Sequence, residues 1–258
     1  MKLRRFIRKA INAAGYDMHK QERDCSPYFD PEFSAVRTAT LNDTTARLFV
    51  SDRRDVIQAH HFSGRFYEAD ILREISKRFF DGGCFVDIGA NVGDHVLYIA
   101  SRFPKASLVA FEPMRKQHVV LMVNMLLNDL AERIKLYKLA ASDSDGIAQM
   151  ITPFQGNLGR SMISDSVSGE WVEKSRVDPF LAGRQVDFIK IDVEGHEMKT
   201  LAGLDETVRR SRPSLLVEVA ERNKAEFVNW LERNRYRIDI EFKHRDQNSE
   251  IFAAPAGK

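Results

Sequence analysis

One short stretch of the chain concentrates side chains that could move a proton. Lys190, Asp192, Glu194 and His196 occupy alternate positions, beginning inside the apolar run Val186–Ile191. Carboxylates, lysine and imidazole are the groups that act as general acids and bases. Alternation along a strand puts Lys190 and Asp192 on one face. The pattern predicts catalytic groups where a buried strand gives way to a loop.

The lysine in this stretch has two interpretations. Burying an ammonium group costs free energy unless it is paired or functional. Lys190 either forms an internal ion pair with Asp192 or Glu218, or takes part in the reaction. We favour a site role for Asp192. His196 is the side chain that titrates nearest neutral pH, although a histidine at a helix start is as often solvent-facing.

A second stretch, Cys84–Gly93, predicts a buried strand, a tight turn and a helix. Gly89 and Gly93 bracket the turn, and glycine lets a ligand approach the main chain. The dinucleotide fingerprint G-x-G-x-x-G, which holds a pyrophosphate, is incomplete here. Asp87 would sit badly beside phosphates. It suits a cationic group such as the amino group or sulfonium of S-adenosylmethionine.

An acidic residue ends the next predicted strand. Glu112 follows the apolar run Ser107–Phe111. In sheets of this kind a carboxylate at that position accepts hydrogen bonds from both hydroxyls of a ribose. Asp87 and Glu112 together therefore predict an adenosine-containing ligand at the carboxyl ends of the strands.

Strands and helices alternate from Phe66 onward, which predicts an α/β fold. We expect a doubly wound, mostly parallel sheet in residues 66–258, closed by an antiparallel C-terminal edge. The predicted strands are Cys84–Ile88, Ser107–Phe111, Ile134–Ala140, Gly146–Thr152, Val186–Ile191, Leu215–Val219, Tyr236–Phe242 and Glu250–Ala253.

Residues 1–65 are expected to form an N-terminal extension. Residues 2–14 carry an apolar helical stripe surrounded by lysine and arginine. Such a helix can contact an anionic membrane surface, but we favour a helix that docks on its own domain. Farther along, Arg47–Ser51 and Asp55–Ala59 are predicted as two short strands.

The composition argues against several classes of protein. Lys+Arg 39 against Asp+Glu 37 leaves a net charge of +2, so no overall field attracts nucleic acid. Cys25 and Cys84 supply neither a disulfide framework nor a zinc spacing. No uncharged apolar run approaches the roughly 18–20 residues of a membrane span. We expect a cytoplasmic protein that does not bind nucleic acid, with an oligomeric state that the sequence does not indicate.

Several motifs resemble those of the FkbM-type S-adenosylmethionine-dependent methyltransferases. They are VDIGANVG at Val86–Gly93, FEP at Phe111–Pro113, NLGRS at Asn157–Ser161 and IKIDVEGHE at Ile189–Glu197, with FYEADIL at Phe66–Leu72 as a lead-in helix. The resemblance implies a class I, Rossmann-like methyltransferase fold with S-adenosylmethionine as methyl donor. It also implies O-methyl transfer to a hydroxyl of a sugar, a glycan or glycolipid, or a natural product.

The resemblance further implies a donor site along the carboxyl ends of the first strands. The residues expected to hold the donor are Asp87, Gly89, Ala90, Asn91, Gly93, Glu112, Pro113, Met114, Ala141, Ser142 and Asp192. Residues 142–146 are equally well explained as a turn, because Ser, Asp and Gly are turn residues.

The acceptor side of the site is expected to include Asn157, Ser161 and Glu218. The first two lie in residues 155–168, which resemble a family loop and are expected to form a lid over the acceptor rather than an ordinary surface loop. Asp192 and Glu218 end neighbouring predicted strands, so they could hold Mg²⁺. A salt-bridged Lys190 explains the same carboxylates and is the favoured alternative.

Two other functions fit a sheet of this type. A nicotinamide-dependent oxidoreductase is disfavoured by the incomplete glycine fingerprint. A catalytically silent nucleoside-binding or scaffold protein is disfavoured because Asp87, Glu112, Lys190 and Asp192 keep buried charges that a retired site does not need.

Overall fold

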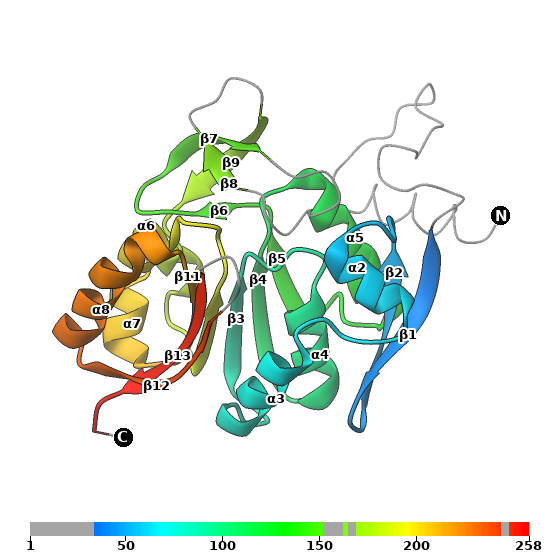
Figure 1. Cartoon of the computed structure of the whole chain (residues 1–258), viewed down its shortest axis with the longest axis horizontal. Helices are drawn as coiled ribbons and strands as arrows, with labels where there is room; N and C mark the ends of the chain where they lie inside the picture. Colours follow the sequence, from blue (N-terminus) through cyan, green and yellow to red (C-terminus); the bar gives the residue numbers. More distant parts are fainter. Residues whose placement is uncertain (1–33, 152–161, 165–168, 244–247, 258) are drawn as a thin grey trace.

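A seven-stranded sheet forms the centre of the protein in the computed structural model, which describes residues 34–151, 162–164, 169–243 and 248–257. Its strands are β3 (Cys84–Ile88), β4 (Ser107–Phe111), β5 (Ile134–Tyr137), β10 (Phe188–Ile191), β11 (Ser214–Val219), β12 (Tyr236–Lys243) and β13 (Ser249–Pro255). They follow the order β12-β13-β11-β10-β3-β4-β5 (Figure 1). The pairs from β11 to β5 are parallel, and β13 runs antiparallel to β11 and β12. The predicted doubly wound sheet and its antiparallel edge are confirmed.

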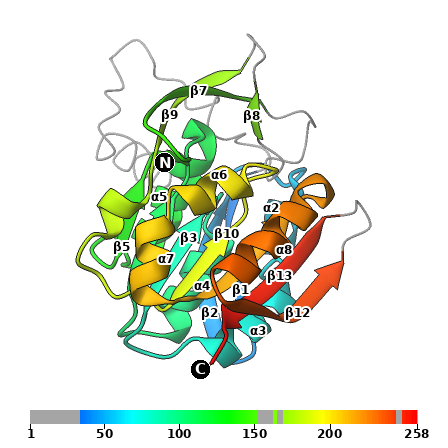
Figure 2. The ribbon, with the colours of Figure 1, turned by 90° about the vertical axis from the view of Figure 1, so that its left-hand side faces the viewer.

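Helices cover both faces of this sheet. The helices on one face are α3 (Ala69–Arg78), α4 (Asp94–Arg102) and α5 (Arg115–Leu127). The opposite face is covered by α6 (Glu197–Ala202), α7 (Asp205–Ser211) and α8 (Lys224–Arg233), together with the short 3₁₀ helices η2 (Asp178–Leu181) and η3 (Glu221–Asn223). Figure 2 shows α6, α7 and α8 in front of the sheet. In the described part of the chain, no helix combines the length and the apolar character needed to cross a membrane.

Side-chain alternation along the central strands creates two separate cores. On the face beneath α3 and α4, Phe85 and Phe188 stack with 5.4 Å between their ring centroids, and both are fully buried. The apolar residues that alternate with them belong to the core beneath α6, α7 and α8. Two positions after each phenylalanine, Asp87 and Lys190 return to the first face. Charge therefore enters the buried layer near the carboxyl ends of β3 and β10.

A smaller sheet lies at one end of the central sheet (Figure 1). It contains β6 (Ala140–Ala141), β7 (Gly146–Ile151), β8 (Met162–Ser164) and β9 (Glu170–Ser175), in the order β6-β9-β7-β8. The strand predicted at residues 146–152 is present as β7. The prediction of one strand over residues 134–140 is wrong, because the chain leaves the central sheet after Tyr137 and enters the smaller sheet at Ala140.

A hairpin and a helix precede the central sheet. The hairpin consists of β1 (Ala35–Leu41) and β2 (Thr44–Val50), so the strand predicted at residues 47–51 is present. The strand predicted at residues 55–59 is wrong, because these residues begin helix α2 (Val56–Phe62). Asp55 caps that helix by accepting a hydrogen bond from the Gln58 N–H at 3.0 Å. The predicted helix at residues 2–14 lies outside the described residues.

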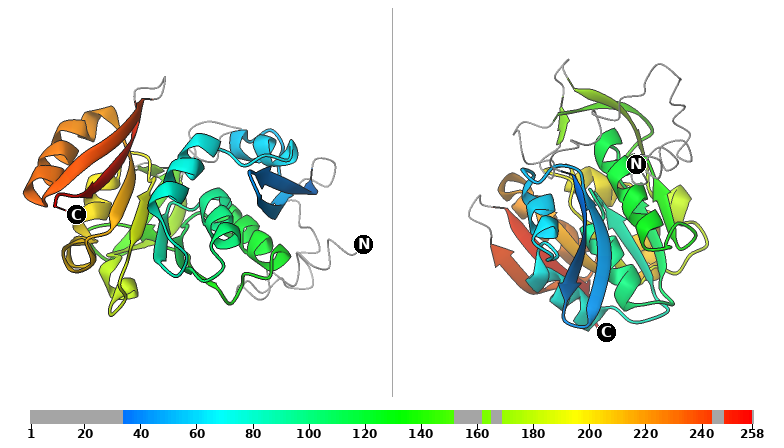
Figure 3. Two further views of the ribbon diagram at one scale, coloured as in Figure 1. Left: turned by 90° about the horizontal axis from the view of Figure 1, so that it is seen from below. Right: turned by 90° about the vertical axis from the view of Figure 1, so that its right-hand side faces the viewer.

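The hairpin shares its core with the central domain. Ala39 and Leu48 belong to the same buried cluster as residues of α3, α4 and α5. Buried Asn124 of α5 accepts a hydrogen bond from the Phe49 N–H at 2.6 Å and donates one to the Val92 carbonyl at 2.8 Å. One side chain thus links the hairpin, α5 and the glycine turn. Figure 3 shows the hairpin and the pair β12–β13 at opposite ends of the molecule.

The turn after β3 needs glycine at its first position. Gly89 has a φ of +78°, and a Cβ there would lie 1.8 Å from the Asp192 carbonyl oxygen. The loop after β3 and the loop after β10 therefore touch through their main chains.

We expect Gly89→Ala to lower the free energy of unfolding by at least about 2–3 kcal/mol, because it adds a main-chain clash to an unfavourable backbone conformation. Gly82→Ala is the matched control, since Gly82 has a φ of +99° with nothing within 4 Å of the added Cβ. It should cost only about 1–2 kcal/mol. Urea denaturation measures both, and equal losses would contradict the close approach of the two loops.

Candidate functional site

Lys190 joins the two loops that meet at the carboxyl ends of β3 and β10. Its ammonium group donates a hydrogen bond to the Gly89 carbonyl at 3.0 Å. It also lies 3.3 Å from a carboxylate oxygen of Asp87 and 3.3 Å from one of Asp192. Burial disfavours the ammonium form, but the two carboxylates outweigh this and raise the pKa of Lys190. Lys190 is therefore a permanent cation between two anions.

The register of the sheet places Glu218 and Glu250 in line with Asp192, and these three residues are called the acidic row below. Ile191 pairs with Val217, so Asp192 and Glu218 follow at the same level of β10 and β11. Glu218 in turn pairs directly with Glu250 across β11 and β13. Like charges directly opposite one another in a sheet are unfavourable. Such a row is energetically costly, and packing alone would not require it.

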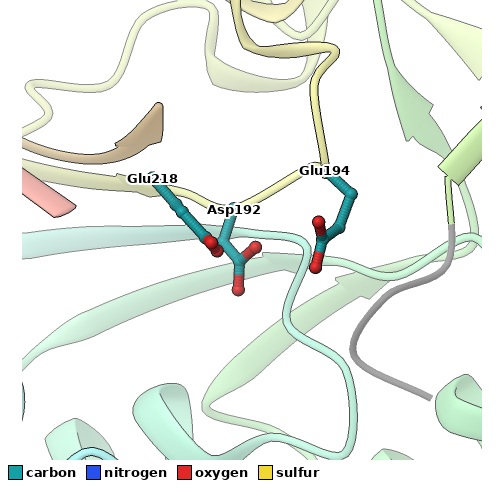
Figure 4. Close-up of side chains that lie close together, drawn as sticks. All are labelled: Asp192, Glu194 and Glu218. Carbon is teal, nitrogen blue, oxygen red and sulfur yellow. The ribbon is translucent and has the colours of Figure 1, made fainter. Parts of the chain in front are cut away.

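The carboxylates of the row influence one another. Burial and the neighbouring Asp192 raise the pKa of Glu218, and the two carboxyl groups share a hydrogen bond. Burial opposes the charge of Asp192 as well, but Lys190 lowers the pKa of Asp192 and keeps it an anion. Figure 4 shows these two side chains together with Glu194, and oxygens of all three lie within 4.8 Å of one another. At this spacing, one proton or one cation could be shared among them.

A pocket lies beside Asp192, which is one of the residues that line it. It has about 560 Å³ of space, part of it open to solvent. Gly89 and Asn91 of the turn, Glu112 and Pro113 after β4, and Ala141 line it, together with Asp192 and His196. These were named from the sequence and are brought together by the fold. The remaining lining residues are Ile88, Gln117, Leu139, Ala140, Met150, Ile163 and Val193, most of them apolar.

Among the residues that the structure describes, Glu112 is one of the two carboxyl groups that line the pocket. Its two oxygens accept hydrogen bonds from the Asn91 N–H and the Met114 N–H, both at 2.8 Å. Burial raises the pKa of Glu112 to about 7, although these two hydrogen bonds act in the opposite direction. Each carboxylate oxygen keeps a further lone pair. Glu112 can therefore accept hydrogen bonds from a ligand without moving.

Five residues expected at the donor do not line the pocket: Asp87, Ala90, Gly93, Met114 and Ser142. Asp87 is fully buried beneath Lys190, and Ala90 is also buried. A Cβ at Gly93 would lie 2.3 Å from Leu121, so Gly93 serves the packing of α4 against α5. Ser142 is buried behind the pocket and contacts His196, with 3.1 Å between its hydroxyl and Nε2.

His196 lies at the end of the pocket that is formed by the smaller sheet. Burial lowers the pKa of His196 to about 4, and nearby Lys199 adds to this effect. Its imidazole is therefore neutral near pH 7. Asn157 and Ser161, with most of residues 155–168, lie outside the described residues.

Several lining residues were not predicted from the sequence. Leu139 directly precedes Ala140 and the predicted residue Ala141 of β6, and Gln117 lies in the first turn of α5, so proximity to predicted residues was a usable signal. Met150 and Ile163 come from β7 and β8. Nothing in their local sequence indicates that the smaller sheet packs over this pocket.

The comparison with known proteins gives the family. The sequence model of the methyltransferase FkbM domain matches residues 87–238, more than half of the chain. The chain belongs to the FkbM methyltransferase family. This membership disfavours the oxidoreductase alternative and confirms the resemblance found in the motifs.

Individual relatives agree with this assignment. Methyltransferase sdnD of Sordaria araneosa is 28% identical over 203 residues, which are 61% of this chain and 78% of that protein. Hexuronic acid methyltransferase AglP of Haloferax volcanii is 24% identical over 223 residues, covering 83% of this chain and 87% of that protein.

A solved structure supports the fold. The crystal structure of a methyltransferase FkbM from Methylobacillus flagellatus KT superposes with a TM-score of 0.52 at 19% identity. The match covers 68% of the present chain and 44% of the solved chain. The present chain therefore matches less than half of the solved protein.

The raised pKa of Glu112 predicts a pH dependence of stability. In the folded state Glu112 titrates at about 7 instead of its ordinary 4.5, so folding favours its protonated form. This contribution is therefore complete below about pH 4.5 and is lost as the pH rises toward 7. Relative to Glu112→Gln, the wild type should lose up to about 3 kcal/mol of unfolding free energy between pH 4.5 and 8.

Denaturant titrations at several pH values measure this difference. The slope with pH is the readout, because the glutamine also alters the two main-chain hydrogen bonds. Glu132→Gln, at an exposed position, is the control and should follow the wild-type curve. Parallel curves for wild type and Glu112→Gln would show that Glu112 titrates normally.

Proposed function

We propose that this protein is an S-adenosylmethionine-dependent O-methyltransferase that acts on a hydroxyl group of a sugar, a glycan or glycolipid, or a natural product. The observation that carries the proposal is the pocket in which Glu112 and the turn after β3 face Asp192. When bound there, S-adenosylmethionine supplies a methyl group activated by its sulfonium charge. Membership of a methyltransferase family supports the same reaction class.

The residues of the pocket fit such a donor. Glu112 would accept hydrogen bonds from the ribose hydroxyls, since its orientation is already set by two main-chain donors. Leu139, Met150 and Ile163 form an apolar wall suited to a flat base. Pro113 and Ala141 would edge it, and His196, neutral and bonded to Ser142, would lie at the same end.

The charges beside the pocket have a role in this proposal. Asp192 remains an anion beside the donor site because Lys190 stabilises it. An anion at this point attracts a sulfonium cation. Asp87 is buried under Lys190 and would act through that lysine rather than by touching the donor. No step of the proposal uses a metal ion, because Lys190 already supplies positive charge to Asp192.

The carboxyl groups close to Asp192 restrict the choice of acceptor. Asp192, Glu194 and Glu218 offer carboxyl oxygens that accept hydrogen bonds from hydroxyl groups. Asp192, which Lys190 keeps an anion, would repel an anionic acceptor. One relative is named a hexuronic acid methyltransferase, which supports a sugar as acceptor. For this chain we propose a neutral, hydroxyl-rich acceptor instead of a uronate.

Donor binding can be tested by filling the pocket. Leu139 is half-buried and lines it, so Leu139→Trp should weaken binding of S-adenosylhomocysteine at least tenfold in calorimetry. Ile147→Trp places the same side chain at a position 67% exposed on the smaller sheet and should change nothing. Absence of S-adenosylhomocysteine binding by the wild type would contradict the proposal.

The acceptor class needs a separate measurement. The wild type is incubated with methyl-labelled S-adenosylmethionine and fractionated cell glycans, lipids and small metabolites, with Leu139→Trp as the inactive control. Label should enter alkali-stable ether linkages on neutral carbohydrate-type hydroxyls. Transfer to protein, to nucleic acid or to a carboxylate as an ester would overturn the proposed acceptor.

A further inference from the structure

The segment before α3 is fastened to the start of α4. The N–H of Tyr67 donates a hydrogen bond to an oxygen of Asp94 at 3.0 Å, and His61 Nε2 lies 2.6 Å from the same oxygen. Glu68 follows, with a φ of +47°, a backbone conformation that residues other than glycine rarely adopt. The contacts to Asp94 hold this strained residue at a set distance from the glycine turn, which directly precedes α4.

The next residue of α4 faces Glu68. His95 is buried, and its Nε2 lies 3.5 Å from a carboxylate oxygen of Glu68. Within the described part of the chain, this nitrogen has no hydrogen-bond partner. Backbone strain of this kind persists where the surrounding structure imposes it, often at a functional site. The FYEADIL motif thus places the carboxylate of Glu68 against the buried imidazole of His95.

Glu68 lies beside the start of α4, which directly follows the glycine turn of the pocket. Burial raises its pKa, the carboxylates of Glu250 and Asp192 raise it further, and Lys190 acts against them. Its side chain is still 22% exposed. Asp192 lines the donor pocket. Glu68 does not line the pocket itself, and an acceptor that extends from Asp192 toward the start of α4 would reach its carboxylate.

We propose that Glu68 accepts the proton of the acceptor hydroxyl and that His95 is a positioning residue for it. This inference rests on the proposed O-methyl transfer. The bond between oxygen and methyl carbon forms as the bond between that carbon and sulfur breaks. The electron pair of the broken bond remains on sulfur, and the hydroxyl proton passes to the Glu68 carboxylate.

The other titratable groups are less suited to this task. Lys190 holds its proton between two carboxylates. Asp192 is a weaker base than Glu68, because Lys190 lowers the pKa of Asp192. Glu218 already accepts a hydrogen bond from the side-chain amide of Asn248 at 3.0 Å. His196 lines the pocket, but its Nε2 is already engaged by the Ser142 hydroxyl at 3.1 Å.

The first test compares Glu68→Gln with Asp70→Asn, a control on the same helix whose side chain is 84% exposed. Transfer is measured with the carbohydrate fraction that the wild type labels. Glu68→Gln should lower kcat at least about 100-fold and abolish the rise of activity with pH. Its calorimetric affinity for S-adenosylhomocysteine should stay within about twofold of the wild type, and Asp70→Asn should match the wild type throughout.

The second test needs no acceptor. In ¹³C NMR titrations of the wild type, several glutamate carboxyls should titrate above the ordinary value of about 4.3, Glu112 and Glu218 among them. One further signal of this kind should vanish in Glu68→Gln, while those of Glu112 and Glu218 remain. The groups that face Glu68 and set this value are His95 and Asp94 of α4, Lys190 and Asp192 of β10 and its loop, and Glu250 of β13. His95→Gln should shift the signal and the acid limb of kcat together, with KM unchanged.

Two results would overturn this inference. One is a Glu68→Gln variant with wild-type kcat and pH profile, and the other is an ordinary titration of Glu68. If the wild type labels no fraction, the proposed function fails instead, while the NMR titration still decides whether Glu68 is a strengthened base.

Discussion

The buried ammonium group of Lys190 is the interaction on which the rest of the site depends. It holds the Gly89 carbonyl, Asp87 and Asp192, and so joins the loop after β3 to the loop after β10. Removing one member of such a group leaves an uncompensated buried charge. The turn that lines the pocket and the anion beside it are therefore set by the same cation.

The two faces of the sheet divide the work. The face beneath α6, α7 and α8 is mostly apolar. The other face changes from the stacked rings of Phe85 and Phe188 to the pair Asp87–Lys190, and then to the acidic row. Strand alternation alone produces this gradient, because every second residue returns to the same face. The proposed acceptor site is the polar end of one continuous layer.

Local sequence patterns were sufficient to predict the central sheet and several residues of the pocket. The shared face of Lys190 and Asp192 follows from strand periodicity, and their ion pair was one of the two interpretations weighed. The start of α2 was mistaken for a strand, although Asp55 followed three residues later by Gln58 is a capping signal. The contact between Glu68 and the α4 histidine was not predictable, because it depends on how α3 packs against α4. The same holds for the smaller sheet, whose strands are short and whose position is set by tertiary packing.

A double-mutant cycle between Lys190 and Asp87 tests the central claim most directly. Unfolding free energies are measured for the wild type, Lys190→Met, Asp87→Asn and the double variant. Lys190→Met should cost about 3–5 kcal/mol, because it leaves the buried carboxylate of Asp87 and the partly exposed carboxylate of Asp192 without their cation. The double variant should cost clearly less than the sum of the single losses. Additive losses would contradict a site held together by this buried cation.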